Sequence, residues 1–296
     1  ILNSEDSLFN QEYLVVAKLH AQDTNSFINL ALDLSLDLIE KYFSSLIKKE
    51  ETIAYNKELN KFDIRQISTF LKLQLFSIPV QSSNGINFTK LIIDLLQNEG
   101  LELLRWSKNA LTLKSRVNFL NHHQDFCDFS DENLLNTLEE WLEPYLTKVT
   151  TIKALQSLDI YSILSSTLSW EQKQILDKNA PLSIKVPSGS NIDIDYSDVE
   201  KPSIKVKIQE VFGLYESPRV LHNTLGLQIH LLTPAMTPMQ ITYDLKSFWE
   251  HSYSEVRKEV RGKYKRHYWP ENPFEAIATN KTKKHMMKNT EHFVNK

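Results

Sequence analysis

The spacing of the apolar residues changes twice along this chain, and this change limits the folds that the chain can adopt. Residues 13–80 carry short apolar stretches separated by turn-like residues, which is typical of β-strands. Between residues 87 and 180 the apolar residues recur at helical spacing, and from residue 182 to residue 243 the alternation typical of strands returns. We therefore expect an α+β protein in which a helical middle region separates two β-rich parts.

The N-terminal β-rich part has the order of a small barrel. Residues 13–19 and 27–34 are rich in strand-forming residues and flank the turn-like sequence AQDTNS, so we expect them to pair. Residues 34–49 have helical spacing and end in lysines. Strand patterns return from Glu51 to Val80, with a turn expected at Asn60. This order of strands and helix predicts an OB-like β domain over residues 1–80.

Helix signals dominate residues 81–181. One helix is predicted to begin near Asn87 and to stop at Gly100, and others to span residues 107–120 and 155–164. Ser130 resembles an N-cap that precedes an apolar stripe running to Tyr145. The sequence SWEQ, residues 169–172, has the spacing of a capping box and predicts a short helix before Pro181.

A second, small β module is predicted over residues 182–250. The segments LSIKV and NIDIDY alternate apolar and polar residues on either side of PSGS, residues 187–190, which favours a hairpin. The amides and hydroxyls of PSGS could also hold a phosphate, although a plain turn needs the same residues and is the favoured interpretation. Further strands are expected in SIKVKI, LQIHLLTP and MQITY.

The sequence lacks the common catalytic signatures, so we expect no catalytic residues in this chain. None of its six glycines belongs to a Walker-type phosphate loop, and neither HExxH nor GxSxG occurs. The chain is therefore expected to be unable to hydrolyse ATP by itself. No apolar run is long enough for a membrane span, we expect no secretory leader, and the single cysteine, Cys127, excludes an internal disulfide. Cytoplasmic location is the expectation.

One short segment is rich in possible metal ligands. The sequence HHQDFCD, residues 122–128, includes His122, His123 and Cys127. A structural zinc site usually needs four ligands at suitable spacing, and no second ligand pair is evident here. We therefore expect no metal, and we interpret the segment as a polar loop in which Phe126 and Phe129 point into the core.

Positive charge is concentrated near the C-terminus. Residues 252–296 contain eleven Lys or Arg residues against five Asp or Glu residues, although the whole chain has a net charge of −3. Cations can neutralise phosphates while aromatic rings stack on unpaired bases, a combination that suits single-stranded nucleic acid. The alternative is a solvated charged face. The candidate binding residues are Arg257, Lys258, Arg261, Lys263, Tyr264, Lys265, Arg266, Tyr268 and Trp269.

Several blocks of the sequence resemble the C-terminal portion of the HrpB-type helicases, a bacterial family of ATP-dependent helicases of the DEAH/RHA class. These blocks, in chain order, are LELLRWSKNALTLKSRVNFL (101–120), DFSDENLL (128–135), LEEWLEPYL (138–146), WEQKQILDKNAP (170–181), LSIKVPSGSNIDIDY (182–196), VKIQEVFGLYESPRV (206–220) and LLTPAMTPMQITYDLKSFWEHSYSEVRKEVRGKYKRHYWPENP (231–273). Residues 11–45 resemble more weakly the closing part of the OB-fold that follows the motor in this class. The lysine-rich end after Phe274 is not part of the family pattern.

The resemblance implies that the motor domains, with their Walker motifs and with ATP and Mg²⁺, lie outside this chain. It favours a non-catalytic accessory region that helps a helicase to hold single-stranded nucleic acid, with RNA favoured by family analogy. The alternative is a protein-interaction platform that docks on the motor domains or on another partner. The basic helix and tail are expected to occupy residues 251–296, with the last 15 to 20 residues loosely ordered because they contain few apolar residues.

Overall fold

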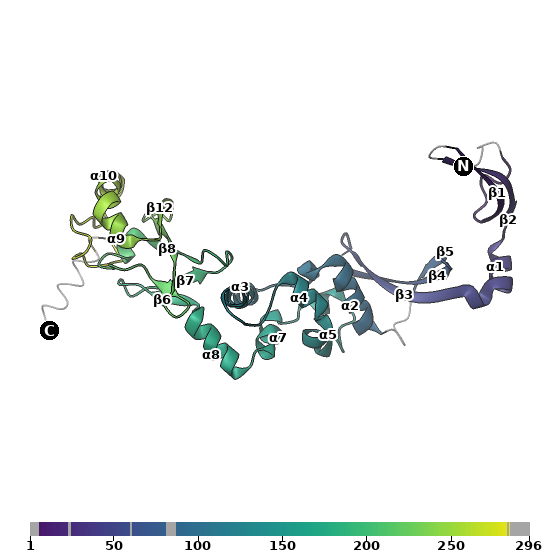
Figure 1. The fold of residues 1–296 in the computed structure, drawn as a ribbon, viewed down its shortest axis with the longest axis horizontal. Helices are drawn as coiled ribbons and strands as arrows, with labels where there is room; N and C mark the ends of the chain where they lie inside the picture. The colour runs from purple at the N-terminus through teal and green to yellow at the C-terminus, as the bar shows by residue number, and fades with distance from the viewer. Residues whose placement is uncertain (1–5, 23–24, 60, 81–86, 283, 285–296) are drawn as a thin grey trace. The chain divides into compact units, whose positions relative to one another are not determined.

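The computed structural model describes residues 6–22, 25–59, 61–80, 87–282 and 284. These residues form two compact units, and the predicted α+β class is confirmed (Figure 1). The first unit contains the chain up to Leu103 together with Glu143–Ser157, and the second contains Leu104–Leu142 and the chain from Leu158 onward. Residues 143–157 therefore leave the helical part of the sequence and pack within the first unit.

Two separate antiparallel sheets form the β structure of the first unit. Strands β1 (Leu14–Gln22) and β2 (Asn25–Asp33) pair as expected. After α1 (Leu36–Phe43), the strands β3 (Ile47–Asn56), β4 (Lys61–Phe70) and β5 (Leu73–Pro79) form a three-stranded meander. The predicted helix is shorter than expected because a 3-10 turn at Ser44–Leu46 leads directly into β3.

The OB-like barrel stays a prediction, because no strand among the described residues joins the two sheets. The turn expected at Asn60 lies outside the described residues. A small core does link the connecting elements. The buried side chains of Tyr13, Ile39 and Leu75 pack together, and the Tyr13 hydroxyl donates a hydrogen bond to the carbonyl oxygen of Leu75. This contact holds the segment before β1 against β5.

Two helices complete the first unit. Helix α2 (Phe88–Glu99) packs against β3, and α6 (Ile152–Gln156) packs against β4. The side chain of Asn87 caps α2 by accepting a hydrogen bond from the Lys90 amide, and Gly100 ends the helix with a φ of 92°. Both predicted boundaries of α2 are therefore confirmed, and glycine is favoured at the end because its φ is positive.

The helices that precede the sheet in the second unit are α3 (Lys108–His123), α4 (Asp131–Asn136), α5 (Leu138–Trp141), α7 (Ile160–Thr167) and α8 (Trp170–Asn179). The caps at Ser130 and Ser169 are confirmed, and Ser169 forms a capping box with Gln172. The apolar stripe after Ser130 is divided at Thr137, whose hydroxyl donates to the Asn133 carbonyl. The helix expected at 155–164 is divided too, because Asp159 caps a new helix.

Five strands form the main sheet of the second unit, in the order β12-β11-β8-β7-β6. They are β6 (Ser183–Lys185), β7 (Asn191–Asp195), β8 (Ser203–Lys207), β11 (Gln228–Leu232) and β12 (Pro238–Thr242). The hairpin predicted around PSGS joins β6 and β7. The short strands β9 (Arg219–Val220) and β10 (Leu225–Gly226) form a separate hairpin that the sequence pattern did not indicate.

Arg116 connects α3 to the end of α8 and is almost completely buried. Its Nε donates to the carbonyl oxygen of Ala180 at 2.6 Å, and its Nη2 donates to the Asp177 carboxylate at 2.7 Å. The exposed fraction of the Arg116 side chain is 5%, whereas that of Asp177 is 67%. The carbonyl at the helix end is thereby satisfied by a guanidinium donor, which fixes the chain direction just before β6.

After β12 the chain enters helical structure beside the five-stranded sheet (Figure 1). Helix α9 (Leu245–Ser247) passes through a π-helical turn at Phe248–Ser252 into α10 (Tyr253–Lys263). Most of the tail that was expected to be loosely ordered lies outside the described residues. Among the residues that the structure does describe, no helix combines the length and apolar character that crossing a membrane requires.

Candidate nucleic-acid interface

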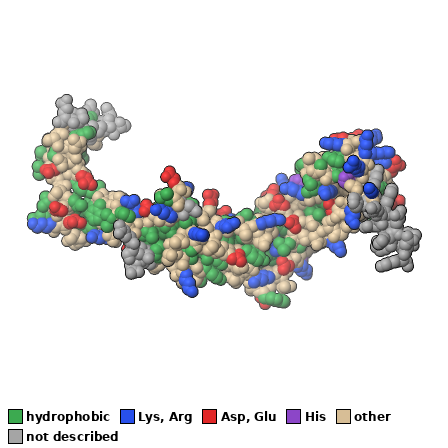
Figure 2. Space-filling view, turned by 180° about the vertical axis from the view of Figure 1, so that it is seen from behind, with side chains coloured by type: hydrophobic (Ala, Val, Ile, Leu, Met, Phe, Trp, Pro, Cys, Tyr) green, Lys and Arg blue, Asp and Glu red, His purple; other side chains and the backbone are tan. Residues whose placement is uncertain are grey.

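Five of the six predicted cations are exposed on α10 and the turn that follows it. They are Lys258, Arg261, Lys263, Lys265 and Arg266. Figure 2 shows Lys and Arg side chains gathered over the upper right of the view, which is where α10 lies when Figure 1 is turned by 180°. We call these five side chains the basic surface. Exposed cations close together on one element can meet successive phosphates of a nucleic-acid strand.

Arg257 differs from the other cations because it is engaged within the protein. Its Nε donates a hydrogen bond of 3.1 Å to the carbonyl oxygen of Trp269, and its Nη2 forms an ion pair of 3.0 Å with Glu271. Only 19% of its side chain is exposed. Arg257 therefore ties α10 to the returning chain, and its guanidinium is not available to a phosphate in this arrangement.

The aromatic residues of the segment are packed rather than open. Trp269 is 5% exposed, and its indole Nε1 donates to the carbonyl oxygen of Tyr264 at 3.0 Å. Tyr268 is half-buried and meets the Phe212 ring edge-on, with the ring centroids 6.4 Å apart. Base stacking by Trp269 stays a prediction that its burial does not favour, because little of the ring is exposed to a ligand. Long-range packing, which the local pattern does not encode, decides this exposure.

Tyr264 is also held by the protein. Its hydroxyl donates a hydrogen bond of 3.3 Å to the Thr233 hydroxyl, at the end of β11. The pKa of Tyr264 is lowered, because the Thr233 hydroxyl can donate to the phenolate oxygen, with smaller contributions from Thr237 and from the charge of Lys263. The Tyr264 ring is half-buried, so it acts chiefly as an anchor between α10 and the sheet.

An aromatic cluster beneath α10 gives the basic surface a rigid base. Tyr253 is buried, its hydroxyl donates to the Pro270 carbonyl at 2.9 Å, and burial raises its pKa. The Phe212 ring lies 5.8 Å from the Trp249 ring and 5.9 Å from the Tyr253 ring, measured between centroids. The indole of Trp249 donates to the Leu214 carbonyl at 3.0 Å. Tyr253 at the start of α10 and Trp249 in the π-helical turn before it thus fix the orientation of the helix.

The PSGS turn is the plain hairpin turn that the sequence favoured. Gly189 has a φ of 88°, a value that suits glycine. The backbone amide of Ser188 donates to the Glu210 carbonyl at 3.2 Å, and its hydroxyl donates to the Glu210 carboxylate at 3.1 Å. A carboxylate already occupies the position that a phosphate would need, and its charge would repel an anion.

His123 and Cys127 of the HHQDFCD segment have partners within the protein. His123 Nε2 lies 2.8 Å from the Val199 carbonyl oxygen, and Cys127 Sγ accepts a hydrogen bond of 3.0 Å from Gln172. Burial raises the pKa of the Cys127 thiol. His122 and His123 belong to the last turn of α3 rather than to a loop, and Phe129 is buried as expected. Within the described ranges, no three or more His, Cys, Asp or Glu side chains are grouped as metal ligands would be.

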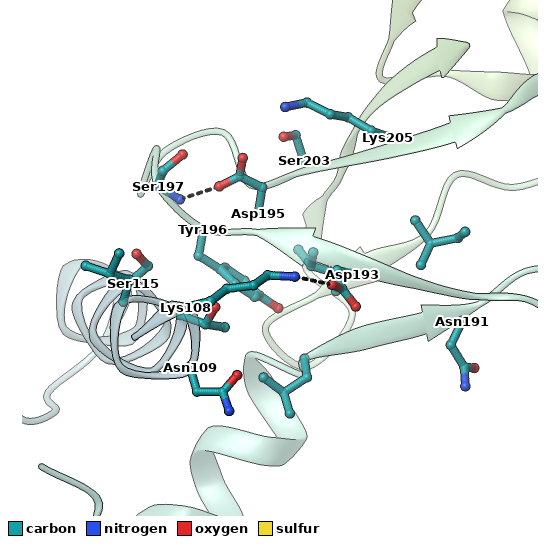
Figure 3. Close-up of a pocket in the computed structure, with 15 residues that line it drawn as sticks. Lys108, Asn109, Ser115, Asn191, Asp193, Asp195, Tyr196, Ser197, Ser203 and Lys205 are labelled. Carbon is teal, nitrogen blue, oxygen red and sulfur yellow. Dashed lines mark hydrogen bonds and ion pairs between the residues drawn. The ribbon is translucent and has the colours of Figure 1, made fainter. Parts of the chain in front are cut away.

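An open groove of about 780 Å³ lies between α3 and the strands β7 and β8 (Figure 3). Lys108 reaches from α3 to Asp193 on β7, with 3.2 Å between Nζ and Oδ2. Hydrogen bonds from Ser197 lower the pKa of Asp195, with help from the charges of Lys205 and His230. Because carboxylates and cations alternate along the groove, it does not favour a polyanion, and the basic surface remains the stronger candidate.

Comparisons of its sequence and structure with known proteins show that this chain is similar to parts of helicases. Residues 141–273 match the family described as ATP-dependent helicase C-terminal. The chain is 32% identical over 297 residues to the ATP-dependent RNA helicase HrpB of Escherichia coli (strain K12). That alignment covers 96% of this chain and 36% of the relative, so the chain spans about a third of the relative's length.

Two solved structures are similar to this chain. The first, a crystal structure of the E. coli DExH-box NTPase HrpB, has a TM-score of 0.67 and 31% identity, over 94% of this chain and 35% of that one. The second, a crystal structure of the Escherichia coli DEAH/RHA helicase HrpB, has a TM-score of 0.59 and 28% identity, over 91% and 34%. The resemblance to the C-terminal region of HrpB that the sequence indicated is confirmed.

Proposed function

Because this chain is similar along nearly its whole length to the C-terminal region of HrpB, we propose that it is a non-catalytic accessory region of a DEAH/RHA-type helicase that helps to hold single-stranded nucleic acid. The observation that carries the proposal is the basic surface. Helix α10 and the following turn present five exposed cations, and buried aromatic side chains hold this helix and turn in place. RNA is the favoured ligand, because the curated relative is named an RNA helicase.

The chemistry of this surface fits phosphates better than base edges. Lys258, Arg261, Lys263, Lys265 and Arg266 are cationic donors, and the aromatic residues among them are half-buried or buried. Such a surface recognises the backbone charge of the nucleic acid and is indifferent to sequence. The motor, with its ATP and Mg²⁺, belongs in this proposal to the part of the longer protein that this chain does not span. We also propose that the N-terminal strands belong to an OB-like β domain and that the protein is located in the cytoplasm.

Direct titration of a single-stranded RNA with the chain tests this function. We expect weak binding at low salt that is similar for several unrelated RNA sequences. Changing Arg261, Lys263, Lys265 and Arg266 together to Ala should reduce the affinity strongly. The matched control removes four exposed lysines elsewhere, Lys148, Lys153, Lys178 and Lys201, and should retain most of the binding. If the two quadruple variants bind alike, or if the parent chain does not bind, the proposal is wrong.

A docking platform is the second candidate, and exposed apolar side chains of the β1–β2 hairpin favour it. Leu19, Leu30 and Leu32 are 59%, 57% and 70% exposed. A two-stranded hairpin is only marginally stable alone, so a partner covering this face would stabilise it. The occupant that we propose is the motor part of the longer helicase, since about two thirds of the relative's length lies outside the alignment. Co-purification of the chain with separately expressed motor domains should be lost in the Leu30→Ser, Leu32→Ser variant.

A further inference from the structure

A second pocket in the same unit contains the exposed aromatic rings that the basic surface lacks. It has a volume of about 610 Å³ and lies where the segment before β9, the β9–β10 turn and the β12–α9 connection meet. Its main side chains are those of Tyr215, Arg219, Asn223, Tyr243, Asp244 and Lys246. The sequence pattern did not indicate this pocket, because Tyr215 and Tyr243 are far apart in the chain and neither belongs to a charged run.

Both tyrosine side chains of the pocket are exposed to solvent, and a hydrogen bond holds the hydroxyl end of Tyr243. Tyr215 is 47% exposed and Tyr243 is 48% exposed, compared with 5% for Trp269. Gln228 Nε2 donates a hydrogen bond of 2.9 Å to the Tyr243 hydroxyl, and the Gln228 side-chain oxygen lies 2.8 Å from His230 Nε2. A ring whose polar end is fixed while its face stays exposed suits stacking, because little side-chain entropy remains to be lost.

The Tyr215 ring is supported on the protein side and carries a movable cation. The Phe274 ring lies 4.9 Å away, centroid to centroid, at an interplanar angle of 39°. The ammonium group of Lys246 lies over the Tyr215 ring at 5.3 Å from the centroid. A lysine head group on a flexible stem can move aside for a flat ligand and remain close enough to meet its phosphate.

The turn that brings Asn223 to the pocket is conformationally strained. Leu221, His222 and Asn223 have φ values of 56°, 53° and 67°, which form a left-handed run without glycine. Asparagine tolerates this region, whereas leucine does so at a cost. Arg219 braces the turn by donating from Nη1 to the Thr224 carbonyl at 3.1 Å. Strain of this kind persists where the surrounding structure holds a functional geometry. The Asn223 amide can both donate to and accept from a base edge.

The pocket is connected rigidly to the frame of the basic surface. The Leu245 amide donates to the Ser217 hydroxyl at 2.9 Å, which joins the start of α9 to the Tyr215 segment. The Trp249 indole donates to the Leu214 carbonyl, immediately before Tyr215. Because α9 continues through the π-helical turn into α10, one continuous element carries Lys246 and three cations of the basic surface, Lys258, Arg261 and Lys263.

We propose that this pocket takes one unpaired base of a single-stranded RNA, stacked on Tyr243 beside Tyr215, with the adjoining phosphates met by Arg219 and Lys246. Asn223 faces the edge of the base. The pocket also contains the carboxylates of Glu216 and Asp244, and Asp244 caps α9 by accepting from the Ser247 amide. These acidic groups disfavour a bare anion and accept hydrogen bonds from base amino groups, so the site selects for the base. This inference rests on the proposed function and adds base contact to its phosphate contact.

The test compares a short single-stranded RNA with an oligomer of the same length and backbone charge in which the bases are absent. Stacking contributes a factor of about 5 to 150 in affinity for each base. We therefore expect Tyr243→Leu to weaken binding of the normal RNA by a factor in this range and to leave binding of the abasic oligomer unchanged. The matched control is Tyr161→Leu, which removes a ring of similar exposure, 41%, from α7. This control should bind both oligomers as the parent does.

The possible outcomes separate the pocket from the basic surface. If Tyr243→Leu weakens the binding of both oligomers equally, or weakens the binding of neither, the base site is wrong while the phosphate function stands. Failure of the parent chain to bind either oligomer at low salt overturns both. Should Tyr243→Leu not fold, the parent chain can be cross-linked to RNA containing 4-thiouridine. Cross-links within residues 215–223 or 243–246 support the base site, and cross-links confined to other segments contradict it.

Discussion

The indole Nε1 of Trp269 donates a hydrogen bond of 3.0 Å to the carbonyl oxygen of Tyr264. This bond closes the chain on itself just after α10 and leaves Trp269 almost completely buried, at 5% exposure. The cations between these two residues, Lys265 and Arg266, are therefore displayed on a short loop with a fixed base. In this segment the charged residues face solvent and the largest aromatic residue maintains the fold.

Replacing Trp269 with Ala should destabilise the protein. Truncating a buried tryptophan leaves a cavity and costs about 3 to 5 kcal/mol in the free energy of unfolding. Urea denaturation followed by circular dichroism would measure this loss. Trp170→Ala is the matched control, because Trp170 is 71% exposed and its removal should change the free energy of unfolding by less than about 0.5 kcal/mol. Equal stability of the two variants would contradict the structural role of Trp269.

RNA binding by the basic surface should depend steeply on salt. If about four of its cations contact phosphates, counterion release gives a slope of about −3 in a plot of log affinity against log salt concentration, at roughly −0.7 for each contact. The variant lacking Arg261, Lys263, Lys265 and Arg266 should give a slope much closer to zero. Fluorescence anisotropy at several salt concentrations would measure both slopes. A slope that stays the same in the variant would place the phosphate contacts on another surface.

Arg116 should stabilise the second unit mainly through the carbonyl groups that it satisfies. The change Arg116→Ala leaves the buried Ala180 carbonyl without its donor and removes the packed aliphatic stem, so we expect a loss of about 2 to 4 kcal/mol. Asp177→Asn should cost less than about 1 kcal/mol, because the Asp177 side chain is 67% exposed and solvent screens its ion pair. Thermal denaturation of both variants would separate the two contributions, and equal losses would argue against this division.

His267 should make the stability depend on pH below neutrality. Desolvation of the ring, with help from the charge of Lys207, lowers the pKa of His267 from its ordinary value of 6.5. Above pH 6.5 the imidazole is neutral in both the folded and the unfolded chain, so its full contribution is present. As the pH falls below 6.5 the unfolded chain binds the proton first, and the free energy of unfolding decreases until the folded pKa is passed.

An NMR titration of the His267 ring checks this prediction directly, with a midpoint expected below 6.5. The decrease in stability between pH 7.5 and pH 5.5, roughly one unit to either side of the ordinary histidine pKa, should be smaller in His267→Gln than in the parent chain. A midpoint at or above the ordinary value would contradict the desolvation argument.

Local features of this protein were predictable because their causes are local. A serine that caps a helix acts on amides two or three residues away, so Ser130 and Ser169 were sufficient to predict the starts of α4 and α8. The PSGS hairpin is equally local, since a positive φ at Gly189 closes the turn. The split of the predicted helix near Asp159 was missed because apolar spacing continued across a residue that could also act as a cap.

By itself, the sequence determined most of the order of strands and helices, the resemblance to a helicase C-terminal region and the concentration of cations near residue 260. It did not determine the β9–β10 hairpin or the helix breaks at Thr137 and Asp159. Only the tertiary structure decided which aromatic residues are available to a ligand. Trp269 lies among the cations and is buried, whereas Tyr215 and Tyr243 lie outside the basic segment and are exposed in one pocket. The physical reason is that exposure depends on contacts between residues distant in the chain, and neither composition nor spacing within a segment encodes those contacts.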